Sequence, residues 1–196
     1  MSRPRPRRRL PVLALCALVT ACAADRALAP HELFDERSGN TVSVVARPLV
    51  FARSRTDVAA YARDYATLVA VELDHSGSVE HYLLLHRWST VDARMSRPPD
   101  PAAGQLEILS SGRIVKLTPL AEPPIGLEHR RDLHLPPHGE VVTHAYRVDG
   151  EVLRFIARHR DATLELPQES FGEPFTLWED GRGAWLEFLR RVGLDS

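Results

Sequence analysis

The stretch "ATLVAVELDHSGSVEHYLLLHRWST", residues 66–90, decides the fold. Two runs of mostly aliphatic and aromatic residues flank the turn-forming sequence Asp74-His75-Ser76-Gly77, which is the pattern of a β-hairpin. Pairing about this turn places Thr67, Val69 and Val71 with Tyr82, Leu84 and Trp88 on one face, and Leu68 and Ala70 with Val79, Leu83 and Leu85 on the other. Both faces are apolar away from the turn, so we expect this hairpin to be covered on both sides.

Shorter segments around the hairpin also favour β-structure. The alternating, β-branched run 41–46 predicts a strand that Pro48 then limits. Residues 105–117 predict a smaller hairpin that turns at Ser110-Ser111-Gly112, and "ATLEL" (162–166) predicts a last strand. Near the C-terminus, "GAWLEFLRRVG" (183–193) predicts an α-helix, because one stripe carries Trp185, Leu186, Phe188, Leu189 and Val192.

A third hairpin is predicted over residues 140–160, "EVVTHAYRVDGEVLRFIARHR", with Asp149-Gly150 as its two-residue turn. In that register one face is core and the opposite face carries Arg147, Arg154 and Arg158. Because guanidinium groups suit phosphate and carboxylate, these arginines form a candidate anion-binding face. The alternative is a solvated strand face whose arginines pair with nearby acids.

Together these segments predict an all-β fold, a β-sandwich or barrel-like antiparallel sheet with one C-terminal α-helix, over a single domain at 41–196. The two cysteines are Cys16 and Cys22, both near the N-terminus, so the domain has to rely on its hydrophobic core without a disulfide.

The N-terminus has the organisation of a secretory signal peptide. Five arginines in residues 1–9 precede the apolar run "LPVLALCALV" (10–19), which is about half of the roughly 20 residues that span a bilayer. The ending "VTAC" (19–22) resembles the lipobox of bacterial lipoproteins. The resemblance implies that residues 1–21 are removed and that Cys22 is acylated, and Ala23 is similar to the outer-membrane sorting pattern. Residues 22–40 are then expected to be a tether.

Charge argues against nucleic acid as a partner. Of the 25 basic residues, 24 are arginines, and removal of the five in the signal leaves 20 basic residues against 26 acidic ones. A chain of net charge near −6 lacks the excess of positive charge that phosphate backbones require.

Histidines in a long proline-rich segment form a candidate metal site. His129, His134 and His138 lie close together in "EHRRDLHLPPHGEVVTH" (128–144), and imidazoles are common zinc and copper ligands. The prolines between them exclude a helix that would align two of these side chains. Loop-surface histidines are the alternative, with His144 directed into the core.

Two tryptophans and one turn are further candidate functional residues. Trp88 and Trp178 could each stack against a ligand, or they could be part of the core, which we expect for Trp88. Asp74, His75 and Ser76 bring triad residue types together, but adjacent residues in a tight turn rarely reach triad geometry. No nucleophile-elbow or phosphate-loop motif is present.

The sequence therefore predicts a non-catalytic lipoprotein of the cell envelope, held in the outer membrane through Cys22, with no cofactor. Its long loops, 91–104 and 118–140, are expected to bind another envelope component, for example a protein partner. A periplasmic metal or small-ligand binder that uses the loop histidines is the alternative, and an enzyme built on the 74–76 turn is the third reading.

Overall fold

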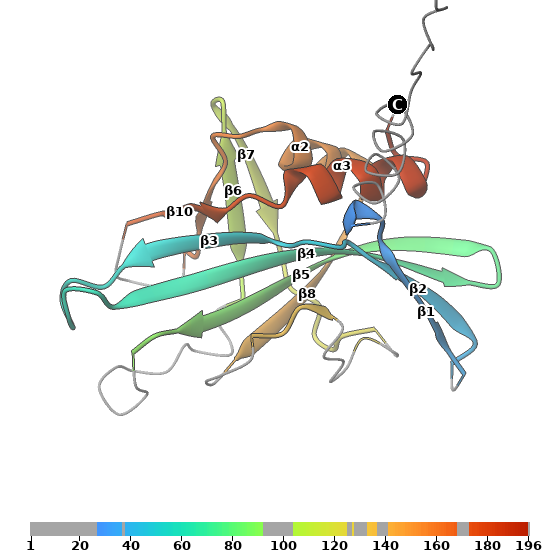
Figure 1. Ribbon diagram of the computed structural model, residues 1–196, viewed down its shortest axis with the longest axis horizontal. Helices are drawn as coiled ribbons and strands as arrows, with labels where there is room; N and C mark the ends of the chain where they lie inside the picture. The colour runs from blue at the N-terminus through green and yellow to red at the C-terminus, as the bar shows by residue number, and fades with distance from the viewer. Residues whose placement is uncertain are drawn as a thin grey trace, which may run out of the picture.

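The computed structural model describes residues 27–36, 38–91, 104–124, 127, 133–136, 141–167 and 173–195. The predicted all-β class is confirmed, because within these residues the chain forms one ten-stranded antiparallel sheet and two helices (Figure 1). The strands are β1 (His31–Asp35), β2 (Asn40–Val44), β3 (Leu49–Ser54), β4 (Arg63–His75), β5 (Ser78–Ser89), β6 (Leu106–Ser110), β7 (Arg113–Leu117), β8 (Val142–Val148), β9 (Thr163–Glu165) and β10 (Phe175–Glu179). The helices are α2 (Gly150–Arg158) and α3 (Arg182–Arg191).

The central hairpin has the predicted register. Strands β4 and β5 pair over their whole lengths, with Val69 opposite Leu84 and Leu68 opposite Leu85. The two-residue turn falls at Ser76-Gly77, both with positive φ (53° and 89°), as the right-handed twist of a tight hairpin requires. Both faces of the pair are buried along its middle, in agreement with the apolar composition of each face.

Two strands, β2 and β3, pair with different parts of the same side of β4, so the sheet divides into two arms there. One side of β4 pairs with β5, and β8 follows beyond β5. The other side is shared: β2 pairs with residues 71–74 and β3 with residues 63–68. The β1–β2 arm therefore diverges from the arm that continues through β3, β10, β9, β6 and β7 (Figure 1).

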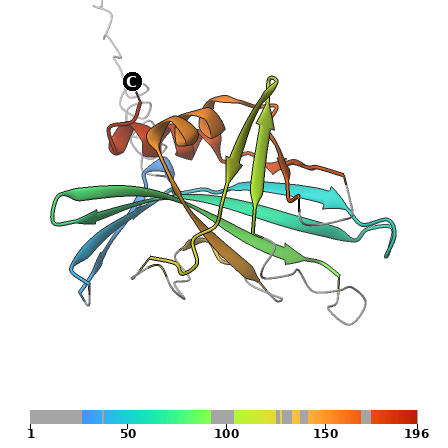
Figure 2. The same cartoon turned by 180° about the vertical axis from the view of Figure 1, so that it is seen from behind.

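Helices α2 and α3 lie together over one face of this curved sheet, and the β6–β7 hairpin rises beside them (Figure 2). Aromatic and aliphatic side chains from both helices and from the strands join a single core, and its largest fully buried members include Trp185, Tyr146, Phe51 and Phe188. The predicted C-terminal helix is confirmed, although Leu186 of the expected apolar stripe is 48% exposed.

The predicted third hairpin is wrong, because only its first half is a strand. After β8 the chain enters α2, and Asp149 is the N-cap: its Oδ1 accepts a hydrogen bond of 2.9 Å from the Val152 N–H. Leu153, Ile156 and Ala157 share the buried side of the helix. These three residues have the i, i+3, i+4 spacing of a helix, and their packing in the core, together with the Asp149 cap, favours the helix over the strand.

The predicted start of the domain is also corrected. Strand β1 lies within the expected tether 22–40 and pairs antiparallel with β2 over all five of its residues. Leu28 and Leu33 pack against the core. The folded part therefore begins well before residue 41. No helix within the described residues is long and apolar enough to span a membrane.

Candidate functional site

The one described member of the predicted histidine site is His134, since His129 and His138 lie outside the described residues. His134 Nε2 is 2.6 Å from the Val45 carbonyl oxygen, to which it donates. Burial lowers the pKa of His134. This nitrogen is therefore engaged by the backbone, and within the described part of the chain no three His, Cys, Asp or Glu side chains are arranged to hold a metal ion.

Another histidine, His86, contacts Leu133, the residue before His134. His86 of β5 is 1% exposed, and its Nε2 lies 2.8 Å from the Leu133 carbonyl oxygen while its Nδ1 lies 2.9 Å from Thr143 Oγ1. Burial lowers the pKa of His86 to about 4, so the ring is neutral at physiological pH. Leu133 and His134 are thus held against the sheet, by hydrogen bonds to His86 and to the Val45 carbonyl oxygen.

His144 lies in the core, as expected. Its side chain packs against Gly104, where a Cβ would come within 2.7 Å of the ring. Its Nε2 is buried without a hydrogen-bond partner among the described residues, and burial lowers its pKa. His144 therefore packs in the core, with the backbone of Gly104 close against its ring.

The predicted basic strand face does not exist, because its three arginines lie on two different elements. Arg147 is on β8 and pairs with Glu80. Arg154 and Arg158 are on α2 and donate to the carbonyl oxygens of Leu194 and Asp195, at 3.3 and 3.0 Å. The two helical arginines therefore contact the end of the chain after α3.

The turn that carries Asp74, His75 and Ser76 is an exposed hairpin tip. Asp74 Oδ1 accepts a hydrogen bond from the Gly77 N–H, and His75 Nδ1 lies 2.5 Å from Asn40 Oδ1 of β2. The histidine thus contacts an asparagine and not the neighbouring serine. This geometry contradicts a catalytic triad in the turn.

Aromatic side chains of β4, β5 and β10 lie close together across the sheet, and with the arginine that contacts them they form a group, Arg63, Tyr65, Trp88 and Trp178, that we call the aromatic surface. Tyr65 and Trp88 are directly opposite in the β4–β5 register, and their rings stack with centroids 4.0 Å apart and planes 8° apart. Trp88 Nε1 donates to Thr67 Oγ1 at 3.2 Å. Both rings are partly buried, so the expectation of a core Trp88 holds only in part.

Trp178 reaches this surface because of a β-bulge. The pairing of β10 with β3 places Leu177 opposite Phe51 and Glu179 opposite Val50, so that Trp178 is the extra residue. Its ring meets Tyr65 edge-to-face at 6.4 Å, and the Arg63 guanidinium lies 4.6 Å from its centroid. Even so, Trp178 is 52% exposed. Bulges redirect side chains in this way and are common near functional sites.

An ion-pair network lies on the opposite face of β4 from Tyr65, because successive side chains of a strand point to opposite faces of the sheet. Asp64 Oδ2 accepts hydrogen bonds from Arg53 Nη2 at 3.0 Å and from Arg55 Nη1 at 3.1 Å. Arg55 also binds Asp57, and that hydrogen bond lowers the pKa of the Asp57 carboxyl. The network fixes the charged side chains at this end of the sheet.

Comparison with known proteins does not place the chain in a family. No family model, no curated protein and no solved structure matches it. The residues themselves therefore carry the functional argument, and the aromatic surface holds a half-exposed tryptophan against Tyr65 and Arg63.

Proposed function

We propose that this chain is a non-catalytic lipoprotein of the bacterial cell envelope. A lipid on Cys22 holds it in the outer membrane, and the aromatic surface binds another envelope protein. The signal-like segment and the lipobox resemblance at 19–22 support the anchor, and the half-exposed Trp178, held in place by its neighbours, carries the binding proposal.

The composition of the aromatic surface favours a protein partner. Trp, Tyr and Arg are the residues most enriched among those that contribute most of the affinity in protein–protein interfaces. Here all three types occur together, with the guanidinium of Arg63 over the Trp178 ring. A partner side chain that covers the open part of this ring would bury a large apolar area at a single point.

The surface is also ordered before any partner arrives. Stacking fixes the rings of Tyr65 and Trp88, a hydrogen bond to Thr67 orients the indole, and Tyr65 contacts the edge of Trp178. Side chains that are already fixed lose less rotamer entropy on binding, which leaves more of the contact energy as affinity.

The test uses the full-length lipoprotein in its native membranes. Chemical cross-linking, purification and mass spectrometry should recover one partner in near-stoichiometric amount. Trp178→Ala should reduce its recovery strongly, since alanine at such a position costs about 2 kcal/mol or more, or roughly thirtyfold in affinity. Phe34→Ala is the matched control, because Phe34 is an exposed aromatic residue (65%) on the distant β1.

The outcomes separate the two parts of the proposal. Equal recovery with Trp178→Ala and Phe34→Ala would remove the aromatic surface as the binding site. The mass of the N-terminal peptide tests the anchor independently, because acylation adds the mass of the lipid to Cys22. An unmodified peptide that begins elsewhere would refute the anchor.

A further inference from the structure

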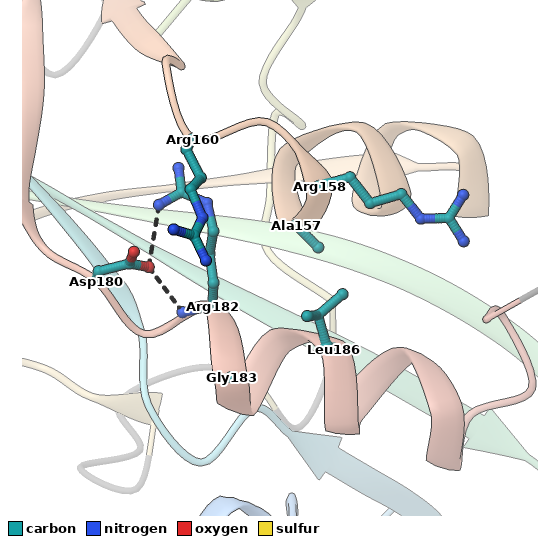
Figure 3. A pocket seen from close by; sticks show the side chains of 7 residues that line it. All are labelled: Ala157, Arg158, Arg160, Asp180, Arg182, Gly183 and Leu186. Carbon is teal, nitrogen blue, oxygen red and sulfur yellow. Dashed lines mark hydrogen bonds and ion pairs between the residues drawn. The ribbon is translucent and has the colours of Figure 1, made fainter.

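A pocket opens between the end of α2 and the start of α3, with a volume of about 480 Å³ (Figure 3). It is lined by three arginines, Arg158, Arg160 and Arg182, by one acid, Asp180, and by the apolar side chains of Ala157 and Leu186. Such a volume suits a small ligand or part of a larger one. The lining carries more positive than negative charge, which favours an anionic group.

Arg182 is the buried arginine of this pocket. Its side chain is 7% exposed, and its Nη2 donates to the His159 carbonyl oxygen at 2.7 Å. Nη1 lies 3.0 Å from Asp180 Oδ1, yet Nε and Nη1 have no hydrogen-bond partner with suitable geometry in the described part of the chain. Both atoms are closed to solvent, so a ligand would meet the charge of this buried guanidinium without a hydrogen bond to Nε or Nη1, and that charge favours an anion.

Arg160 is a second, exposed arginine in the lining of the same pocket, together with Asp180. Figure 3 shows Arg158 extending away from Asp180. The lining thus holds three guanidinium groups and one carboxylate, so a bound anion would bring its charge closer to balance.

The N-terminus of α3 faces the same pocket. Its N-cap is Gly181, which makes no side-chain capping bond, and Asp180 Oδ1 accepts the Arg182 N–H at 3.0 Å. Gly183, the next residue, is exposed and lines the pocket. The Ala184 N–H donates to the Gly181 carbonyl oxygen, so the Gly183 N–H is the group that a ligand would reach at this end of the helix, where the dipole favours negative charge.

We propose that this pocket binds the phosphate of a membrane lipid headgroup. Arginine forks and a helix N-terminus together match the oxygens of a phosphate. The apolar ledge of Ala157 and the 48% exposed Leu186 contacts the carbon atoms next to that phosphate. A free phosphate would satisfy the arginines alone and leave the ledge unused.

The position of the pocket along the chain favours a lipid, and this step rests on the proposed anchor. Leu28 lies beside the first turn of α3: a Cβ on Gly183 would be 3.7 Å from Leu28 Cδ1. Leu28 is six positions after Cys22, and a chain of that length spans at most about 20 Å when extended. An acylated Cys22 would therefore keep the pocket within about that distance of the bilayer surface.

Isothermal titration calorimetry of the full-length chain in a neutral detergent tests the proposal. The probes are inorganic phosphate, glycerol phosphate and dihexanoyl phosphatidylglycerol. The lipid should bind about tenfold more tightly than inorganic phosphate, because the ledge buries additional methylene groups. Arg160→Gln should weaken binding of the lipid about tenfold. Arg147→Gln, which changes an exposed arginine on β8, should leave it unchanged.

Each contrary result overturns a defined part of the inference. Binding of the lipid that Arg160→Gln does not weaken, or no saturable binding by any probe, would refute the pocket. Inorganic phosphate that binds as tightly as the lipid would refute the headgroup as the ligand. Acylated Cys22 without lipid binding would contradict only the pocket, and phosphate binding with unmodified Cys22 would contradict only the anchor.

Discussion

Acidification should destabilise the chain through His86. The imidazole is 1% exposed, and both ring nitrogens make hydrogen bonds, to Leu133 and Thr143. Burial is the main cause of its low pKa, the Leu133 carbonyl partly opposes it, and His134 lowers the pKa further. The folded chain thus holds His86 neutral, whereas unfolding exposes a ring with the ordinary pKa.

The sign and size follow from these two values. The pKa falls from 6.5 in the unfolded chain to about 4 in the folded one, so between these pH values the unfolded chain binds the additional proton. Stability therefore decreases as the pH falls through 6.5, and the loss is complete below about pH 4. A difference of about 2.5 pKa units corresponds to about 3 kcal/mol of unfolding free energy.

Urea unfolding, followed by tryptophan fluorescence at several pH values between about 7 and 4, measures this loss for the full-length chain and for His86→Gln. Glutamine retains a donor and an acceptor but does not protonate in this range. Carboxylates titrate in both proteins, so their contribution cancels in the difference. The wild type should lose about 3 kcal/mol more than the variant. Equal losses would refute the claim that burial suppresses protonation of His86.

Two substitutions test the backbone around the helices. Gly181→Ala should destabilise the chain by about 2–3 kcal/mol in the same urea assay, because the new Cβ would lie 2.2 Å from the Pro48 carbonyl oxygen, whereas Gly183→Ala adds only ordinary contacts. Asp149→Ala removes the capping bond to the Val152 N–H and should cost about 1 kcal/mol, seen as a melting temperature lower by several degrees; an unchanged value would argue against the cap.

Sequence patterns predicted those elements in which local signals agree. The central hairpin follows from alternation on both strands and from the turn at Ser76-Gly77. Residues 140–160 did not follow, because Asp149-Gly150 is a hairpin turn by composition and a helix N-terminus in the structure. The spacing of Leu153, Ile156 and Ala157 suits the helix, and packing of these residues in the core selects it.

Sequence patterns did not predict the aromatic surface or the arginine-lined pocket. The exposure of Trp178 depends on a single unpaired residue in β10, and no pattern in "FTLWEDG" reveals a bulge. The burial of Arg182 depends on how α3 packs against the segment after α2, because His159 supplies its acceptor. Arginines that seem to share a strand face, such as Arg147 and Arg154, prove to lie on a strand and a helix.

The edge position of β1 has a consequence for how far the domain stands from a membrane. This strand pairs with β2 alone, and most of its side chains are exposed, so it belongs to the part of the sheet that opens at low free-energy cost. While β1 is paired, the first packed side chain is Leu28, six positions after Cys22. When β1 and Leu28 detach, the free segment extends to Asn40 and its full reach rises from about 20 Å to about 60 Å. With a lipid on Cys22, as proposed, fraying of this one strand would allow the rest of the fold to lie farther from the bilayer while the other strands stay paired.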